Sequence, residues 1–247
     1  MIPFRISTAS QANTQLKEVE DGGLANLRWL ETYAGEYLQT GSLLLLGGAS
    51  NTDFRLRVAQ SHARSDMRPS LWSHVAILTQ PQDQTWAIKE VSLIPPQGFG
   101  DVPACNAAQE STLVSYDAPD RWPNIALLSF PVQGDQVKEG MQRLAIDRGI
   151  VDLGALLIPW LAFVWGAGNA ANPLLQDQGI PSAVYAETIM GIAGLELTPG
   201  LSSQSSCPEA IWQSAKWWYQ FYTQTEGQGQ SPKGVYTLRQ RAAAVML

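Results

Sequence analysis

The chain has 247 residues, of which 45% are hydrophobic and 15% charged, a composition typical of a globular protein with a large buried core. Its net charge of −6 argues against a nucleic-acid-binding protein, because such proteins usually carry a basic face. Two cysteines and two histidines are too few for a disulfide framework or a metal-ligand cluster, so we expect neither a metal nor another cofactor.

The start of the chain lacks the long apolar core of a signal peptide, which predicts that the Sec machinery does not export the protein. Cys105 and Cys207 have no CxxC neighbour, and a reducing compartment is the default for such a chain. We therefore expect a cytoplasmic location; export by another machinery would leave no signature in the sequence. Residues 1–20 are polar and are expected to be loosely ordered.

The next part of the chain predicts two helices separated by a strand. Residues 21–38 place leucines at helical spacing, and residues 51–67 have a second helical pattern. Between them, the four leucines at 43–46 predict a short buried strand. The predicted caps are Asp21 for the first helix and Asn51 or Thr52 for the second.

A β-hairpin is predicted next. Residues 73–80 predict its first strand, residues 81–84 its turn and residues 85–94 its second strand. Residues 95–122 are rich in proline, glycine, alanine and aspartate and predict a long loop or insertion. Residues 123–132 then predict another strand.

Residues 154–168 form an uncharged apolar run that Pro159 interrupts. The run is shorter than the ~20 residues that cross a bilayer. A buried helix or a core hairpin is one interpretation. The other is an element that contacts lipid or a membrane surface, and membrane contact through residues 154–168 stays open.

The rest of the chain is mostly helical. Helices are predicted over 134–149, 181–194 and 208–223, and a terminal strand or turn over 234–240. Neither an internal repeat nor a clear linker is present, so we expect residues 1–247 to form a single α+β domain.

Cys207 lies where a small-residue loop gives way to the last predicted helix. A thiol there feels the positive end of the helix dipole and uncapped backbone N–H groups, and both favour the thiolate. His74 lies at the start of a predicted strand and can act as the base for Cys207 if the fold brings the two residues together. The alternative is that Cys207 is an inert small hydrophobic residue.

Glu90 can orient His74 if the hairpin strands have a suitable register. The residue opposite His74 is either Glu90 or Val91, and in the second case Glu90 lies on the other face of the sheet. Trp86, Ile88 and Glu90 alternate onto one face, which favours the first register. A carboxylate there would hold the histidine tautomer. The alternative is an ordinary surface carboxylate.

These residues predict a Cys–His–Glu arrangement for nucleophilic catalysis. Cys207 would attack an acyl carbon as a thiolate, and His74 would hold the proton and pass it to the leaving group. Glu90 would orient His74. The backbone N–H of Cys207, with a nearby loop donor, would stabilise the oxyanion.

Five short motifs follow one another in a recognisable order. The sequence LQTGSLLLL opens the first core strand, SHVAIL carries His74, and AIKEV carries Glu90. SSCPEAIW then presents Cys207, and GVYTL closes the series.

This order resembles the circularly permuted papain-like hydrolases of the NlpC/P60 superfamily, the YiiX/YebB-like group. The resemblance covers roughly residues 38–92 and 200–240, and the segment 95–200 would then contain insertions. Three positions depart from the family pattern. Ser42 replaces an acid, Ala76 replaces a glycine and Pro208 replaces a serine, but no reacting group is lost.

The resemblance implies an α+β permuted papain-like fold, with an antiparallel sheet packed against helices and the nucleophile at a helix N-terminus. It also implies hydrolysis of amide bonds in peptides, often cell-wall peptides, or chemistry on lipid acyl groups. Trp72, Ser73 and Trp212 lie near the reacting residues in sequence and are the predicted substrate-binding residues. Core packing is the alternative for the tryptophans.

Three other functions stay open at this stage. The first is a lipid acyltransferase, and the second is a binding module that keeps the cleft without the chemistry. The third is a toxin or secreted effector, which predicts an inhibitor protein as partner. The expected substrate is a peptide or an acyl compound.

Overall fold

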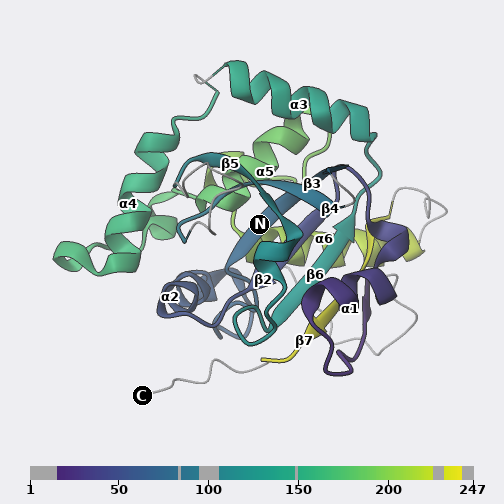
Figure 1. Ribbon diagram of the computed structural model, residues 1–247. Coiled ribbons are helices and arrows are strands. Elements are labelled where there is room, and N and C mark those ends of the chain that lie inside the picture. The colour runs from purple at the N-terminus through teal and green to yellow at the C-terminus, as the bar shows by residue number, and fades with distance from the viewer. Residues whose placement is uncertain (1–15, 83–84, 95–105, 148–149, 225–230, 241–247) are drawn as a thin grey trace.

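The computed structural model describes residues 16–82, 85–94, 106–147, 150–224 and 231–240. Its centre is a seven-stranded sheet with the strand order β1-β7-β6-β2-β3-β4-β5 (Figure 1). β1 pairs with β7 in parallel, and the other neighbouring strands are antiparallel. The strands are β1 (Leu16–Glu18), β2 (Leu43–Gly47), β3 (His74–Gln82), β4 (Thr85–Val91), β5 (Ala108–Thr112), β6 (Asn124–Ser129) and β7 (Lys233–Leu238).

Helices cover both faces of this sheet, and each face has its own apolar core. The larger core packs residues from α2, α3, α4, α5 and α6 against one face. The smaller core packs α1 and the 3-10 helix Leu113–Tyr116 against the other. The α-helices are α1 (Asn26–Tyr33), α2 (Asn51–Ala59), α3 (Gly134–Ile146), α4 (Leu153–Trp165), α5 (Pro181–Ile192) and α6 (Pro208–Gln224).

The predicted α+β class is confirmed, as are the main strands and helices. β2 consists of the leucine run and Gly47, and all five of its residues are buried. Because β2 lies in the middle of the sheet with a core on each face, both sets of its alternating side chains are apolar. The N-terminus of α6 is at Pro208, as the fixed φ of proline favours.

Both predicted helix caps are wrong. α1 begins at Asn26, because Gly22 and Gly23 adopt positive φ angles of 58° and 73° and form a turn. Asp21 instead accepts a hydrogen bond from Arg239 at 2.5 Å. At α2 the cap is Ser50, which forms a capping box with Asp53.

Residues 95–122 were expected to form a long loop or an insertion, and the loop alternative is wrong for the part that the structure describes. Residues 106–122 contain β5, which forms one edge of the sheet, and the 3-10 helix Leu113–Tyr116. The predicted turn at 81–84 falls partly on residues 83–84, which lie outside the described residues, and Gln82 still belongs to β3.

The pairing of β3 with β4 differs from both registers predicted for His74. Ile77 lies opposite Lys89 and Leu78 opposite Ile88. Continuing this register toward the start of β3 aligns Ala76, not His74, with Glu90. His74 therefore lies diagonally across from Glu90, two residues along, but on the same face of the sheet.

Candidate active site

His74 and Glu90 form a buried pair on neighbouring strands. The Nε2 atom of His74 lies 2.6 Å from the Oε2 atom of Glu90. The two residues are 5% and 0% exposed. The predicted contact between them is thus confirmed, because alternation along two paired strands keeps both side chains on one face even though the register is shifted.

Three further side chains donate hydrogen bonds to Glu90, and the sequence alone does not reveal them; the longest of these bonds, 3.4 Å, runs from Gln109 on β5 to Oε1. Ser111 on β5 donates a hydrogen bond to Oε1, and Tyr116 donates one to Oε2. The Tyr116 ring also stacks on the His74 ring, with 6.0 Å between their centroids. All three donors lie in the segment that was predicted as a loop. Residues 108–112 read AQEST, which has no apolar alternation, so the sequence carries no strand signal that would have revealed them.

These contacts set the protonation states of Glu90 and Tyr116. Burial by itself raises the pKa of Glu90, but the hydrogen bond and charge of His74, with the hydrogen bonds of Ser111 and Tyr116, outweigh burial and bring that pKa below its ordinary value. Burial, together with the charge of Glu90, raises the pKa of Tyr116 well above 10. At neutral pH, Glu90 is therefore a carboxylate that accepts from a protonated Tyr116.

A carboxylate at Glu90 also selects the histidine tautomer. Because an ionised carboxylate only accepts hydrogen bonds, Nε2 of His74 carries the proton in that bond. No hydrogen bond among the described residues uses Nδ1. Nδ1 is therefore the ring nitrogen that can accept a proton from a nucleophile.

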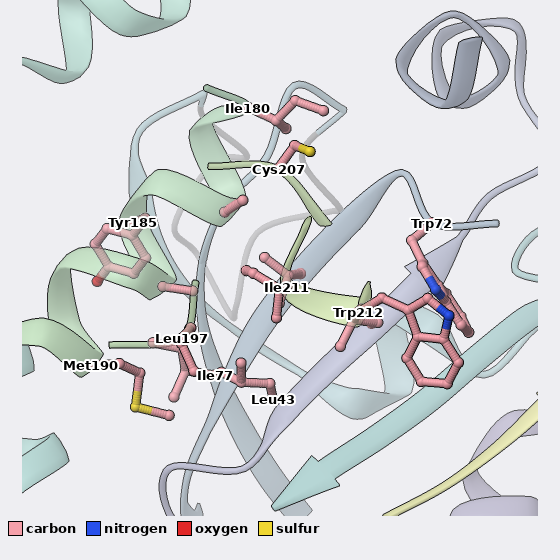
Figure 2. Packing of buried hydrophobic residues seen from close by; sticks show 14 of the residues in the cluster. Leu43, Trp72, Ile77, Ile180, Tyr185, Met190, Leu197, Cys207, Ile211 and Trp212 are labelled. Atoms are coloured by element: carbon pink, nitrogen blue, oxygen red, sulfur yellow. The ribbon is translucent and has the colours of Figure 1, made fainter. Parts of the chain in front are cut away.

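Cys207 lies directly before α6, as predicted, but its thiol is buried. The residue is 2% exposed and belongs to the larger core. Figure 2 shows its side chain beside Ile180, with Ile211 one turn further along α6.

The prediction of a thiolate at Cys207 is wrong for this form of the protein. Burial, with a smaller contribution from the charge of Glu209, raises the pKa of the thiol to about 12. The backbone N–H groups of Ala210 and Glu209 at the start of α6 act in the opposite direction. Loss of hydration at a fully enclosed thiol therefore outweighs the helix N-terminus.

The structure does not bring Cys207 and His74 into contact. Cys207 shares the larger core with Val75 and Ile77, whereas Ala76 belongs to the smaller core on the opposite face of the sheet. Alternation along β3 places the His74 side chain on the Ala76 face. Among the described residues, no hydrogen bond joins the thiol to the imidazole.

The backbone before His74 and the start of α6 are nevertheless tied together. Ser70 donates to the Glu209 carboxylate at 2.6 Å. The Gln60 side chain joins the same two segments, because it accepts from the Glu209 backbone N–H at 2.8 Å and donates to the Trp72 carbonyl at 2.9 Å. Cys207 thus lies two residues before Glu209, and His74 lies two residues after Trp72. Gln60 links Glu209 and Trp72 by hydrogen bonds.

A buried carboxylate that the sequence analysis missed holds the segment before Cys207. Glu187 accepts backbone N–H bonds from Leu197 and Thr198, each at 3.0 Å, and a bond from the Ser206 hydroxyl at 3.3 Å. Burial raises the pKa of Glu187, and these hydrogen bonds oppose the rise. Glu187 therefore fixes the backbone that leads into the thiol.

The three predicted substrate-binding residues are not exposed in this form, so that prediction needs correction. Trp72 and Trp212 are 0% and 3% exposed and pack edge to face, with 5.2 Å between centroids. Ser73 is 1% exposed, donates to Asp53 at 2.8 Å and accepts from the Gly48 backbone at 3.0 Å. All three belong to the packing around the site.

In the described part of the chain, no three or more His, Cys, Asp or Glu side chains are grouped so that they could hold a metal ion. Comparison with known proteins adds no further assignment: no family model matches the chain, and no curated protein matches it.

Proposed function

We propose that the protein is a cysteine hydrolase that cleaves an amide bond, with Cys207 as nucleophile, His74 as base and Glu90 as the group that orients the base. The observation that carries this proposal is the His74–Glu90 hydrogen bond of 2.6 Å, with Glu90 held in turn by Ser111 and Tyr116. A histidine with one nitrogen fixed by a carboxylate and the other available is suited to general acid–base catalysis.

The proposed reaction uses the free histidine nitrogen. Nδ1 of His74 takes the proton from the Cys207 thiol as the sulfur attacks the carbonyl carbon, and the proton then passes to the leaving amine as the carbon–nitrogen bond breaks. Water hydrolyses the resulting thioester with the same base. The Cys207 backbone N–H is the proposed donor to the oxyanion.

The proposal requires that the thiol leave its apolar surroundings and meet Nδ1, since the two are apart in the form described. The links from Glu209 to Ser70 and through Gln60 keep the start of α6 beside the segment that enters β3. Because the thiol and the imidazole lie on opposite faces of the sheet in this form, the proposed route carries the turn at Cys207 around the end of β3, where His74 is the first residue.

A permuted papain-like architecture is part of the same proposal. The base, the orienting residue and the nucleophile occur in that order along the chain, on β3, on β4 and before α6. β2, β3 and β4, which carry the first three motifs, are neighbours in the sheet. We also retain the cytoplasmic location as part of the proposal.

An activity screen tests the function directly. The chain is incubated with peptides, cell-wall peptides and acyl lipids, and hydrolysis is followed by mass spectrometry. Replacing Cys207→Ala or His74→Ala should reduce the turnover number of any cleaved substrate by about 10⁴-fold or more, because both groups act as one unit. The matched control Cys105→Ser should retain wild-type turnover. Equal turnover in Cys207→Ala would refute the proposal, and transfer of the acyl group to an acceptor other than water would redirect it to an acyltransferase.

A binding module is the second candidate, and the enclosed thiol with its pKa of about 12 favours it. In this case the His74–Glu90 pair only stabilises the fold. This candidate predicts that a bound peptide or acyl compound remains intact. It also predicts that the compound binds Cys207→Ala as tightly as the wild type, and isothermal titration calorimetry would measure both affinities.

A further inference from the structure

One side of α4 exposes apolar side chains to water, and this exposure is energetically unfavourable. The helix has no charged residue, and neither does the whole segment 153–176. Ile158 and Trp165 on α4 are each 68% exposed, and Leu175 in the adjoining 3-10 helix is 69% exposed. A helix that is apolar on all sides is normally enclosed by protein or lipid.

The geometry of α4 separates a buried side from an outer side. Leu157, Trp160 and Val164 face the larger core. Spacing of 100° per residue places Ile158 and Trp165 within about 20° of each other and about 120° away from the middle of the buried side. Figure 1 shows α4 at the periphery of the molecule, where one side of the helix faces away from the sheet.

We propose that this outer side of α4 docks on the surface of an electrically neutral phospholipid bilayer, with Ile158 inserted at the level of the acyl chains and Trp165 at the headgroup boundary. No helix in the described parts of the chain is long and apolar enough to span a membrane, so α4 would lie in the plane of the interface. The proposal does not depend on catalysis by Cys207.

The ends of α4 are suited to an apolar environment because their backbone groups have partners within the protein. The Asp152 carboxylate accepts from the Ala155 N–H at 3.0 Å. At the other end, Nη1 of Arg55 donates to the carbonyls of Phe163 and Val164 at 3.2 and 3.0 Å. Satisfied backbone groups lower the free energy of transfer into lipid.

The size of the face favours lipid over a second copy of the chain. A helix of 13 residues is about 20 Å long, and its outer side is about 10 Å wide, which gives about 200 Å². A standard protein interface needs about 800 Å² from each partner. Burial of one helix face is enough for an interfacial helix.

The charge of the protein specifies the kind of lipid. The chain carries a net charge of −6, and the segment 153–176 offers no lysine or arginine to an anionic headgroup. Arg55, at the end of α4, already donates to the carbonyls of Phe163 and Val164. Anionic lipids should therefore not strengthen binding. A tryptophan at the end of the face, at position 165, suits the headgroup boundary.

Flotation with phosphatidylcholine vesicles tests the proposal. The wild-type chain should float with the vesicles, and Ile158→Asp/Trp165→Asp should reduce the bound fraction about tenfold or more. The control Met67→Asp/Leu201→Asp adds the same two charges at positions that are 65% and 43% exposed outside α4, and should float like the wild type. Circular dichroism and thermal melting would establish that all three chains are folded.

Four results would overturn the proposal. The wild type could stay at the bottom of the gradient, or the α4 variant could float as well as the wild type. Light scattering could also reveal a concentration-dependent dimer that only the α4 variant loses, and this would assign the face to a second copy. Stronger, salt-sensitive binding on adding phosphatidylserine would contradict the choice of a neutral bilayer.

Discussion

Alkylation of Cys207 by iodoacetamide in the native, ligand-free chain is expected to be about three orders of magnitude slower at pH 7 than alkylation of a free cysteine. The thiolate is the reacting species, and the pKa of about 12 leaves far fewer thiolates than the ~8.5 of an exposed thiol. The rate should still be rising about tenfold per pH unit at pH 10. Mass spectrometry of the chain with Cys105→Ser measures this rate.

Unfolding in urea is the control for this measurement, because it exposes the thiol and should restore the rate of a free cysteine. An apparent pKa well below 8.5 in the native chain, lost in His74→Ala, would contradict the expectation. That outcome would show that a thiolate–imidazolium pair is already assembled in solution. Acceleration of the slow reaction by a bound substrate would instead support a nucleophile that becomes exposed during the catalytic cycle.

Replacement Glu90→Ala is expected to lower the free energy of unfolding by about 3–5 kcal/mol. The change removes the acceptor for His74, Ser111 and Tyr116 at once and leaves their donors buried without partners. Urea denaturation followed by tryptophan fluorescence measures the loss. Glu31→Ala is the matched control, because Glu31 forms an exposed ion pair with Arg28 and should change stability by less than about 1 kcal/mol. A similar small effect from Glu90→Ala would show that the network adds little to the fold.

The dependence of this effect on pH follows from the lowered pKa of Glu90. A carboxyl group whose pKa is lower in the folded than in the unfolded state contributes stability above the unfolded pKa, and that stability is lost as the pH falls through the folded pKa. The ordinary value for Glu90 is 4.5, and the folded value lies below it. The difference in unfolding free energy between the wild type and Glu90→Gln should therefore be constant near neutral pH and become smaller below about pH 4. A difference that grows on acidification would show that the pKa of Glu90 is raised.

The contact of His74 with Glu90 shows what local sequence periodicity can establish. Both residues occur in strands with alternating side chains, so a shift of two residues in register left them on the same face. The hairpin pattern therefore favoured their meeting, although a shift of one residue in register would have placed Glu90 on the other face of the sheet. Ser111 and Tyr116 were not predictable in the same way, because β5 is a short edge strand that follows residues rich in proline and glycine.

By itself the sequence determined the α+β class, the central strands and the position of Cys207 before α6, because periodicity and the fixed φ of proline act over a few residues. Only the tertiary structure decided that Cys207 is enclosed, that its thiol and His74 belong to opposite faces of the sheet, and that Trp72 and Trp212 pack inside. The same holds for the outer side of α4, since a uniformly apolar run does not reveal which of its sides the rest of the chain covers. Burial depends on segments that are distant in sequence, and burial sets both the pKa of a thiol and the exposure of a helix face.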